Sequence, residues 1–464
     1  VGCYEADWKA RYSADLNARR AAVTVASPAV WETEVGSPVL FGEPSAFALE
    51  LDGENCERGW KFKDFSKNEE ISPKGDRILH CVLTLENERK PLRLSVHTLL
   101  DGTQMMTRYY EMENLSDGPM TLNRLGLLGG GLDSTDLNEV AFTARPDARN
   151  TYSLGYFDSD DWGREGEFSW HDLTDHTGDK VVIDTRFGRN RHRHPLLFIR
   201  DKEMGQIRFM QIGWSGGCRF TVDYNVQNGW NRTFLSFCAE ITGYHPLTVL
   251  MPGEKFVTPE IYFGVIYGGL DDAVNEMNAH LRRSVLHMPE IDGSACYVGA
   301  GMGAEHDMSV ETTKSFMKQM ADMGAEIFII DAGWYCPPGK ESSDWWGMNG
   351  INRPDAERYP GNSFAELRDY CHSLGMKFAM WAEIERIGPL APIAAEHPEW
   401  FAGDLCGYRN SPGFIDLTVP EAAAWAENEL ARIIEEYKLD LLRVDYNISI
   451  FDAFRFRDLG SGCE

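Results

Sequence analysis

Leu439-Asp440-Leu441-Leu442-Arg443-Val444-Asp445-Tyr446-Asn447 is the stretch that decides the fold of this 464-residue chain. The apolar residues Leu441, Leu442 and Val444 form a short run, which is typical of a strand covered on both faces in a parallel sheet. Charged side chains within and after such a run are costly to bury unless they are paired. We therefore expect a buried strand that presents the Asp445 carboxylate at its carboxyl end, where parallel α/β barrels carry catalytic groups. The alternative is that Asp445 only begins the next loop.

The segment before this strand has the pattern of a helix. Thr418-x-x-Glu421 predicts a capping box at its start, and Pro420 suits the first turn. Apolar residues then recur at helical spacing, at Ala423, Ala426, Leu430, Ile433 and Tyr437. A helix followed by a buried strand is the repeating order of a parallel α/β fold.

Three further strands are predicted upstream, at residues 296–298, 326–331 and 376–381, with helices between them that Ser309 and Ser363 would cap. Polar side chains recur where the predicted strands end, at Asp331, Glu383, Glu385 and Asp445. Four strand–helix steps in one direction predict a parallel sheet with helices outside, as in a (β/α)8 barrel. Carboxylates at several strand ends are the pattern of its active site.

Residues 1–288 have a different pattern, which predicts an N-terminal antiparallel β-sandwich. Leu92–His97 alternates strictly between apolar and polar residues, as a half-buried strand does. Further strands are predicted at 181–183, 196–199 and 206–210, and turns at Asp52-Gly53, Asp101-Gly102 and Asp117-Gly118.

The change of pattern falls near residue 288. Residues 270–283 have helical spacing, and Pro289–Gly293 resembles a linker. We therefore expect two domains: the sandwich at 1–288 and the partial barrel, with strands one to four, at 289–464.

Composition narrows the function. The chain is 43% hydrophobic and carries a formal net charge of −27, which argues against nucleic acid and membrane partners. Its ten cysteines show no CxxC pairs and predict reduced thiols rather than a disulfide framework. Together with the absence of a signal-peptide pattern, this leans towards a cytoplasmic location. No metal or organic cofactor is implied.

Several motifs resemble glycoside hydrolase family 36, the clan of α-galactosidases and α-N-acetylgalactosaminidases. Residues 330–335 (IDAGWY) are similar to the second-strand motif of the family, 375–385 (GMKFAMWAEIE) to its third-strand motif, and 443–447 (RVDYN) to its nucleophile strand. The segments HPEW at 397–400 and DLTVPE at 416–421 resemble the connecting regions, and the sandwich segments 108–111, 213–216 and 252–254 also match. The resemblance covers nearly the whole chain in the order of the family.

The resemblance implies a retaining mechanism on α-galactoside-like sugars, through a covalent glycosyl-enzyme on Asp445. It also implies a set of substrate-binding residues: Asp331, Trp334, Trp345 or Trp346, Glu383, Arg409, Arg443 and Asn447. An oligosaccharide or glycoside is then the expected partner, and a homo-oligomer is possible. Structural alternatives stand beside these roles: Asp331 and Arg443 could form an ion pair, and Glu383 and Glu385 could close the loop after the third strand.

Two positions depart from the pattern of the family. The second strand usually ends with two aspartates, where this chain has Asp331-Ala332, and the nucleophile strand usually carries lysine where this chain has Arg443. The arginine guanidinium donates several hydrogen bonds in one plane, whereas the lysine ammonium is a compact point charge, so the two residues are not interchangeable at this position. Both changes favour a close relative of galactose, such as an α-N-acetylgalactosaminide, as an alternative substrate.

A retaining glycosidase needs a second carboxylate as its acid/base, and in the family this residue lies on the sixth barrel strand. We therefore expect the chain to be a truncated copy of a longer enzyme, with little activity of its own. Two other functions stay open: a non-catalytic carbohydrate-binding or split-enzyme subunit, and a transglycosylase of the raffinose-synthase kind.

Overall fold

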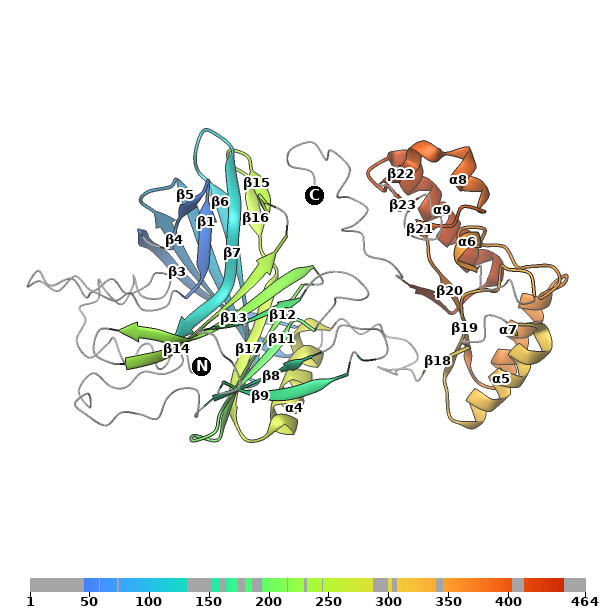
Figure 1. Ribbon diagram of the computed structural model, residues 1–464, viewed down its shortest axis with the longest axis horizontal. Coiled ribbons are helices and arrows are strands. Elements are labelled where there is room, and N and C mark those ends of the chain that lie inside the picture. Colours follow the sequence, from blue (N-terminus) through green and yellow to red (C-terminus); the bar gives the residue numbers. More distant parts are fainter. Residues whose placement is uncertain are drawn as a thin grey trace, which may run out of the picture. The chain divides into compact units, whose positions relative to one another are not determined.

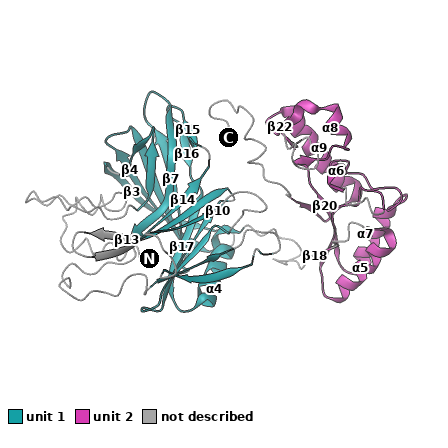
Figure 2. Ribbon diagram, viewed as in Figure 1, with its two compact units in different colours: residues 1–287, 464 teal, residues 288–463 magenta. Residues whose placement is uncertain are grey.

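The computed structural model describes residues 46–57, 59–72, 75–131, 152–158, 164, 166–173, 180–185, 194–214, 216–228, 232–243, 245–286, 299–302, 307–338, 345–402 and 413–445 (Figure 1). The chain divides into two compact units, residues 1–287 and residues 288–463, with residue 464 grouped with the first (Figure 2). The sequence analysis sets its boundary one residue later. No described helix is both long and apolar enough to cross a membrane.

The first unit is antiparallel and consists mainly of two sheets. The larger contains ten described strands: β3 (Trp60–Ile71), β4 (Arg77–Asn87), β5 (Leu92–Leu100), β6 (Met105–Asn114), β8 (Tyr152–Phe157), β9 (Phe168–Asp172), β11 (Leu196–Asp201), β12 (Gln206–Gly213), β16 (Lys255–Val257) and β17 (Glu260–Tyr267). Their order is β3-β4-β5-β6-β17-β12-β11-β8-β9, and β16 pairs with β6. The smaller sheet contains seven: β1 (Ala48–Leu51), β2 (Glu54–Asn55), β7 (Met120–Gly131), β10 (Lys180–Thr185), β13 (Gly217–Asn228), β14 (Arg232–Thr242) and β15 (Thr248–Leu250).

The alternation expected for β5 is confirmed. Leu92, Leu94 and Val96 are buried in the core of the first unit, whereas the intervening residues are half-buried. The strands expected at 181–183, 196–199 and 206–210 are also present, as β10, β11 and β12. One hydrophobic core contains residues of both sheets, such as Leu94 of β5 and Phe220 of β13, so the two sheets pack as an antiparallel sandwich.

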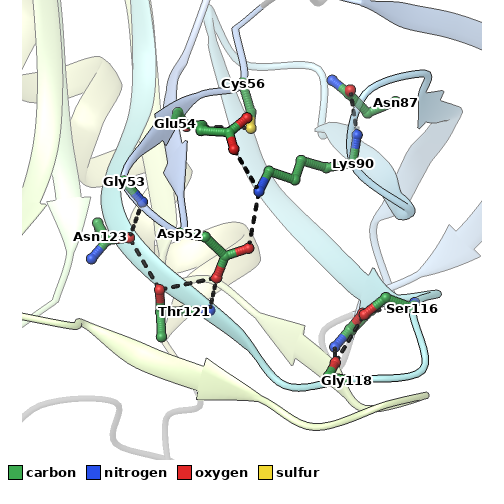
Figure 3. Close-up of polar contacts among 11 residues, drawn as sticks. Asp52, Gly53, Glu54, Cys56, Asn87, Lys90, Ser116, Gly118, Thr121 and Asn123 are labelled. Atoms are coloured by element: carbon green, nitrogen blue, oxygen red, sulfur yellow. Dashed lines mark hydrogen bonds and ion pairs between the residues drawn. The ribbon is translucent and has the colours of Figure 1, made fainter.

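The predicted turn at Asp52-Gly53 joins β1 to β2 (Figure 3). Both residues have positive φ values, +51° and +75°, which suit a two-residue hairpin loop. The Asp52 carboxylate accepts hydrogen bonds from the Thr121 backbone N–H at 2.8 Å and from Lys90 Nζ at 3.2 Å. Partial burial alone would raise the pKa of Asp52, but these donors outweigh it and hold that pKa below its ordinary value.

In the described part of the first unit, helix α4 (Leu270–His280) continues into the π-helical turn η2 (Leu281–Val285). The His280 ring is buried and lies 2.8 Å from Asp101 Oδ2 through Nδ1, and Ser284 donates to the same oxygen at 2.6 Å. Burial would raise the pKa of Asp101, but these hydrogen bonds lower it far below its usual range. The helix is therefore fixed to the β5–β6 turn by a buried polar network.

The second unit is built on a parallel sheet with the order β18 (Gly299–Met302), β19 (Ile327–Ile330), β20 (Lys377–Ala382) and β24 (Leu441–Val444). Three long helices lie between these strands along the chain: α5 (Val310–Asp322), α7 (Ser363–Ser373) and α9 (Pro420–Tyr437). The remaining elements are α6 (Trp345–Met348), α8 (Pro392–Glu396), the 3₁₀ turn η4 (Pro398–Trp400) and a small sheet of β21 (Arg386–Ile387), β22 (Phe401–Ala402) and β23 (Gly413–Ile415). The first expected strand, 296–298, falls on residues outside those described.

The core of this unit joins one face of the parallel sheet to the helices. Phe328 and Phe378, from β19 and β20, are fully buried with Leu367 of α7 and Ile433 of α9. This is the outer layer of an α/β barrel, in which helices cover the sheet. The fold class expected from the sequence, a β-sandwich followed by parallel strand–helix units, is thus present.

Three local expectations were wrong. Ser363 does not cap α7, because it is the first residue of that helix, Asn362 occupies the cap position, and the Ser363 hydroxyl donates to the Pro360 carbonyl. Strand β24 is not covered on both faces: it lies at the edge of the described sheet, where Leu441 is 38% exposed and Val444 is 48% exposed. The Thr418 hydroxyl does not cap α9, because it donates to Asp416 Oδ1 at 2.6 Å and Val419 occupies the cap position.

Candidate active site

Strand register brings the predicted carboxylates to one edge of the parallel sheet. Ile330 of β19 pairs with Met380 of β20, and Ala382 of β20 pairs with Val444 of β24. Asp331 directly follows β19, and Asp445 directly follows β24. Because the carboxyl ends of parallel strands share one edge, residues 114 positions apart in the sequence (445 − 331) lie around the same site.

Asp445 is held by its neighbouring strand. Its backbone N–H donates to the Ala382 carbonyl at 2.9 Å, which extends the β20–β24 ladder by one residue. Trp381 Nε1 donates to Asp445 Oδ2 at 2.8 Å, and Arg443 Nη2 lies 3.5 Å from the same oxygen. A charge-assisted bond from a buried indole fixes the orientation of this carboxylate.

Arg443 connects two strand ends. Its Nη1 lies 3.4 Å from Asp331 Oδ2, while Nη2 faces Asp445. The Ala332 backbone N–H donates to the other Asp331 oxygen at 2.8 Å. The side chains of Asp331, Asp445 and Arg443 are 21%, 29% and 42% exposed, so a ligand can reach all three. The expected ion pair between Asp331 and Arg443 is therefore present, in a cluster whose side chains stay partly exposed.

A glycine leaves room beside this cluster. A Cβ at Gly301, at the end of β18, would lie 3.6 Å from Asp331 Oδ2 and 4.0 Å from Arg443 Nη1. Any larger side chain at residue 301 would extend towards the Asp331–Arg443 pair. The arrangement of carboxylates around a guanidinium suits the binding of sugar hydroxyls, which donate to carboxylates and accept from arginine.

Glu383 lies in the interior instead of facing this space. Its side chain is fully buried and its oxygens lie 3.2–3.3 Å from the Arg386 guanidinium, with Asn349 Nδ2 donating at 3.3 Å. Trp334 is also fully buried, and its indole N–H donates to the Trp381 carbonyl at 3.1 Å. Glu383 thus closes the loop after β20 and Trp334 supports the backbone of Trp381 from the core, so the structure does not bring either side chain to the Asp331–Arg443–Asp445 cluster.

The two tryptophans of α6 have different surroundings. Trp345 and Trp346 stack with ring centroids 4.3 Å apart. Trp345 packs edge-on against Trp381 at 5.6 Å, whereas Trp346 lies over the Arg386 guanidinium at 4.1 Å. Trp345 is therefore linked to the Asp445 cluster through Trp381, and Trp346 is linked to the buried Glu383–Arg386 pair.

Two expected site residues, Arg409 and Asn447, lie outside the described part of the chain. One functional contact was missed at the sequence level: Trp381 as the donor to Asp445. The signal exists in the strand register, since Trp381 pairs directly with Arg443, but sequence alone does not specify that register. Within the described ranges, no group of three or more His, Cys, Asp or Glu side chains is arranged to hold a metal ion.

The known proteins that resemble this chain include several named α-galactosidases. Residues 255–458 match the family model named Melibiase. An α-galactosidase of Escherichia coli is 24% identical over 383 residues, which cover 80% of this chain and 49% of that protein. The α-galactosidase Mel36A of Lactobacillus acidophilus is 22% identical over 289 residues, covering 60% of this chain and 38% of the relative. The chain thus spans about half, or less, of the length of these curated relatives.

Solved structures show the same fold. An α-galactosidase from Lactobacillus brevis superimposes with a TM-score of 0.69 at 19% identity, covering 90% of this chain and 55% of that one. The family 36 α-galactosidase AgaB from Geobacillus stearothermophilus gives 0.68 at 17% identity, with coverages of 91% and 56%. The sandwich and the parallel strand–helix units of this chain thus have the fold of these α-galactosidase structures. The chain is thus similar to α-galactosidases, including structures of glycoside hydrolase family 36, over residues 255–458 in the family model and over most of its length in the superimposed structures.

Proposed function

We propose that the chain carries the nucleophile half of a retaining glycosidase active site for terminal α-galactosides or closely related sugars. The observation that carries this proposal is the Asp445 carboxylate, which is oriented by Trp381 and Arg443 at an accessible strand end. Relatives named α-galactosidases support the sugar class, and structures of AgaA variants from Geobacillus stearothermophilus are complexes with stachyose and raffinose.

In this mechanism an Asp445 oxygen forms a bond to the anomeric carbon as the bond to the leaving oxygen breaks. The leaving group takes a proton from an acid, and water later cleaves the glycosyl–Asp445 ester after giving its proton to the same group, now a base. That group must be a carboxyl about 5–5.5 Å from the nucleophile. We assign none of the described carboxylates to this role.

The Arg443 contacts bear on the choice of sugar. One guanidinium reaches both Asp331 and Asp445, a two-sided contact that a lysine ammonium, as a point donor, would not reproduce in the same geometry. Arg443 and Asp331 would then orient hydroxyls of the terminal sugar. Both α-galactosides and α-N-acetylgalactosaminides are reasonable substrates for this cluster and should be compared directly.

Covalent trapping tests the proposal without requiring an acid. The full chain is incubated with a fluorinated α-galactosyl derivative that carries an activated leaving group, and the intact mass is measured. We expect a mass increase of one sugar residue, located on the peptide that contains Asp445, and no increase for Asp445→Asn.

The control is Asp322→Asn, which changes an exposed aspartate at the end of α5 and should be labelled like the unmodified chain. Labelling of Asp445→Asn at the rate of the unmodified chain would overturn the assignment. A chain that binds galactosides in calorimetry, keeps that affinity in Asp445→Asn and is never labelled would be a carbohydrate-binding protein instead.

A further inference from the structure

Strand β3 forms one edge of the ten-stranded sheet (Figure 1). It pairs with β4 along its length, from Trp60 opposite Asn87 to Ile71 opposite Arg77, and no other described strand pairs with its second side. Every residue of β3 after Trp60 is exposed. Edge strands expose unpaired backbone groups and are usually protected by bulges or charges, because they can pair with another chain.

The two halves of β3 differ in whether a bulge protects the unpaired edge. A bulge between Phe62 and Asp64 interrupts the first half, whereas residues 65–71 pair with β4 in unbroken register. Phe65 is 53% exposed and Ile71 is 66% exposed, which is unusual for large apolar residues on a strand. Side chains alternate between faces, so Phe65, Lys67, Glu69 and Ile71 share one face of the second half.

The order of these four residues is self-complementary. Read in either direction, the face presents an apolar residue, a charge, the opposite charge and an apolar residue. We propose that residues 65–71 pair antiparallel with the same residues of a second copy of the chain, around a two-fold axis at Asn68. Phe65 then opposes the partner's Ile71, and Lys67 opposes the partner's Glu69.

The position of the axis follows from strand geometry. Directly opposed residues of an antiparallel pair point to the same face, so a two-fold axis must pass through a residue and not between two residues. An axis at Lys67 would oppose two lysines and place Phe65 against glutamate. An axis at Glu69 would oppose two glutamates and place Lys67 against isoleucine. Only the axis at Asn68 pairs apolar with apolar and unlike charges together.

The association should be weak. Seven residues in one strand pair bury less area than the roughly 1,200–2,000 Å² of a stable protein interface. We therefore expect dissociation on dilution through the micromolar range, at about 0.15 M salt. Such a dimer would join the two large sheets edge to edge and remove the exposed edge from both copies.

Cysteine crosslinking tests the axis directly, using the full chain. Asn68→Cys places two thiols opposite each other across the axis, where the Cα separation of about 4.5–5.5 Å suits a disulfide. Ser66→Cys is the matched control on the same face of the same strand, because its nearest copy would lie about 13 Å away along the strand. We expect a disulfide-linked dimer from Asn68→Cys under mild oxidation, reversed by reductant, and none from Ser66→Cys.

Equal crosslinking of the two cysteine variants, or none from Asn68→Cys at high micromolar concentration, would overturn the proposal. The second outcome would mean that another segment of the chain or a different partner covers β3. Crosslinked species larger than a dimer would also contradict it, since an isologous pair closes on itself.

A charge exchange tests the register independently of any thiol. Lys67→Glu opposes two like charges at both symmetric positions, and we expect the dimer dissociation constant to rise about tenfold in sedimentation velocity. The double variant Lys67→Glu/Glu69→Lys restores unlike pairs and should recover most of the association. The control is Lys61→Glu, on the bulged half of β3, which should leave the dissociation constant unchanged. A double variant that associates as weakly as Lys67→Glu would contradict the register.

Discussion

At the scale of single residues, the Glu383–Arg386 ion pair is fully enclosed among the described residues of the second unit. Glu383 and Arg386 are 0% and 2% exposed, and Arg386 also donates to the Trp346 carbonyl at 2.9 Å. Removing one member of such a pair leaves a buried charge without compensation, which typically destabilises by about 3–5 kcal/mol. The pair thus holds the loop after β20 in place rather than binding substrate.

Arg386→Met should therefore reduce the free energy of unfolding by about 3–5 kcal/mol, measured by denaturant titration with tryptophan fluorescence. Glu383→Gln/Arg386→Met removes both charges and should recover at least half of this loss. An Arg386→Met variant that unfolds like the unmodified chain would contradict the structural role. A substrate-binding role for Glu383 would instead appear as weaker galactoside binding in Glu383→Gln with unchanged stability.

At the scale of elements, β24 is fixed to β20 by a side chain as well as by its ladder. Asp440, just before β24, receives the Phe378 backbone N–H at 2.8 Å on Oδ2, and His372 Nε2 of α7 lies 2.7 Å from the same oxygen. Partial burial would raise the pKa of Asp440, but these two contacts outweigh it and lower that pKa. One carboxylate thus connects a helix and two strands.

The lowered pKa of Asp440 determines how the stability of the second unit changes as the pH falls. Because the pKa of Asp440 is lower in the folded chain than in the unfolded chain, its contribution to stability is complete above the unfolded value of about 4 and is lost as the pH falls through the folded value. Asp440→Asn should lower stability at pH 7 by about 1–2 kcal/mol and by progressively less between about pH 5 and pH 3. A difference between variant and unmodified chain that grows with acid would contradict this assignment.

Some elements were predicted correctly from the sequence and others were not. Alternation along β5 and the turn at Asp52-Gly53 were predictable because both signals are local. The cap of α9 was not, because the Thr418 hydroxyl binds Asp416 instead of the helix. We expected β24 to be covered on both faces because its residues are apolar. The exposure of a strand depends on which elements lie beside it, and the apolar residues of the strand do not specify those neighbours.

The residues of the candidate site also divide into those whose position the sequence predicted and those whose position it did not. Asp331, Arg443 and Asp445 were predicted together because parallel strands end at one edge, and the structure brings them within contact of Arg443. Glu383 and Glu385 follow a strand end as well, yet Glu383 turns inward to Arg386. The direction of a side chain after a strand depends on the following loop, which sequence spacing does not describe.

At the scale of the whole molecule, charge is the dominant property. The chain has 72 acidic and 45 basic residues, a formal net charge of −27. A large net charge destabilises the compact state through self-repulsion, and salt screens that repulsion over a Debye length of about 10 Å at 0.1 M. Exposed ion pairs, such as Lys61 with Glu88, contribute little to stability, so screening them has a smaller effect.

We therefore expect the melting temperature to rise when NaCl is increased from about 0.01 M to about 0.3 M. Scanning calorimetry measures this, with an equal osmolality of a neutral solute as the control. A melting temperature that falls over this range would show that local ion pairs outweigh the net repulsion.

The hairpin loop at Asp52-Gly53 has a consequence for the chemical durability of the chain. Aspartate followed by glycine is prone to spontaneous rearrangement to isoaspartate, because the glycine nitrogen can attack the side-chain carboxyl, most readily when that carboxyl is protonated. Here the Gly53 N–H donates to Asn123 Oδ1 at 3.0 Å, and Thr121 and Lys90 keep the Asp52 carboxylate ionised and turned away (Figure 3). Folding thus protects this bond from ageing, and isoaspartate at residue 52 would record the time that a molecule had spent unfolded.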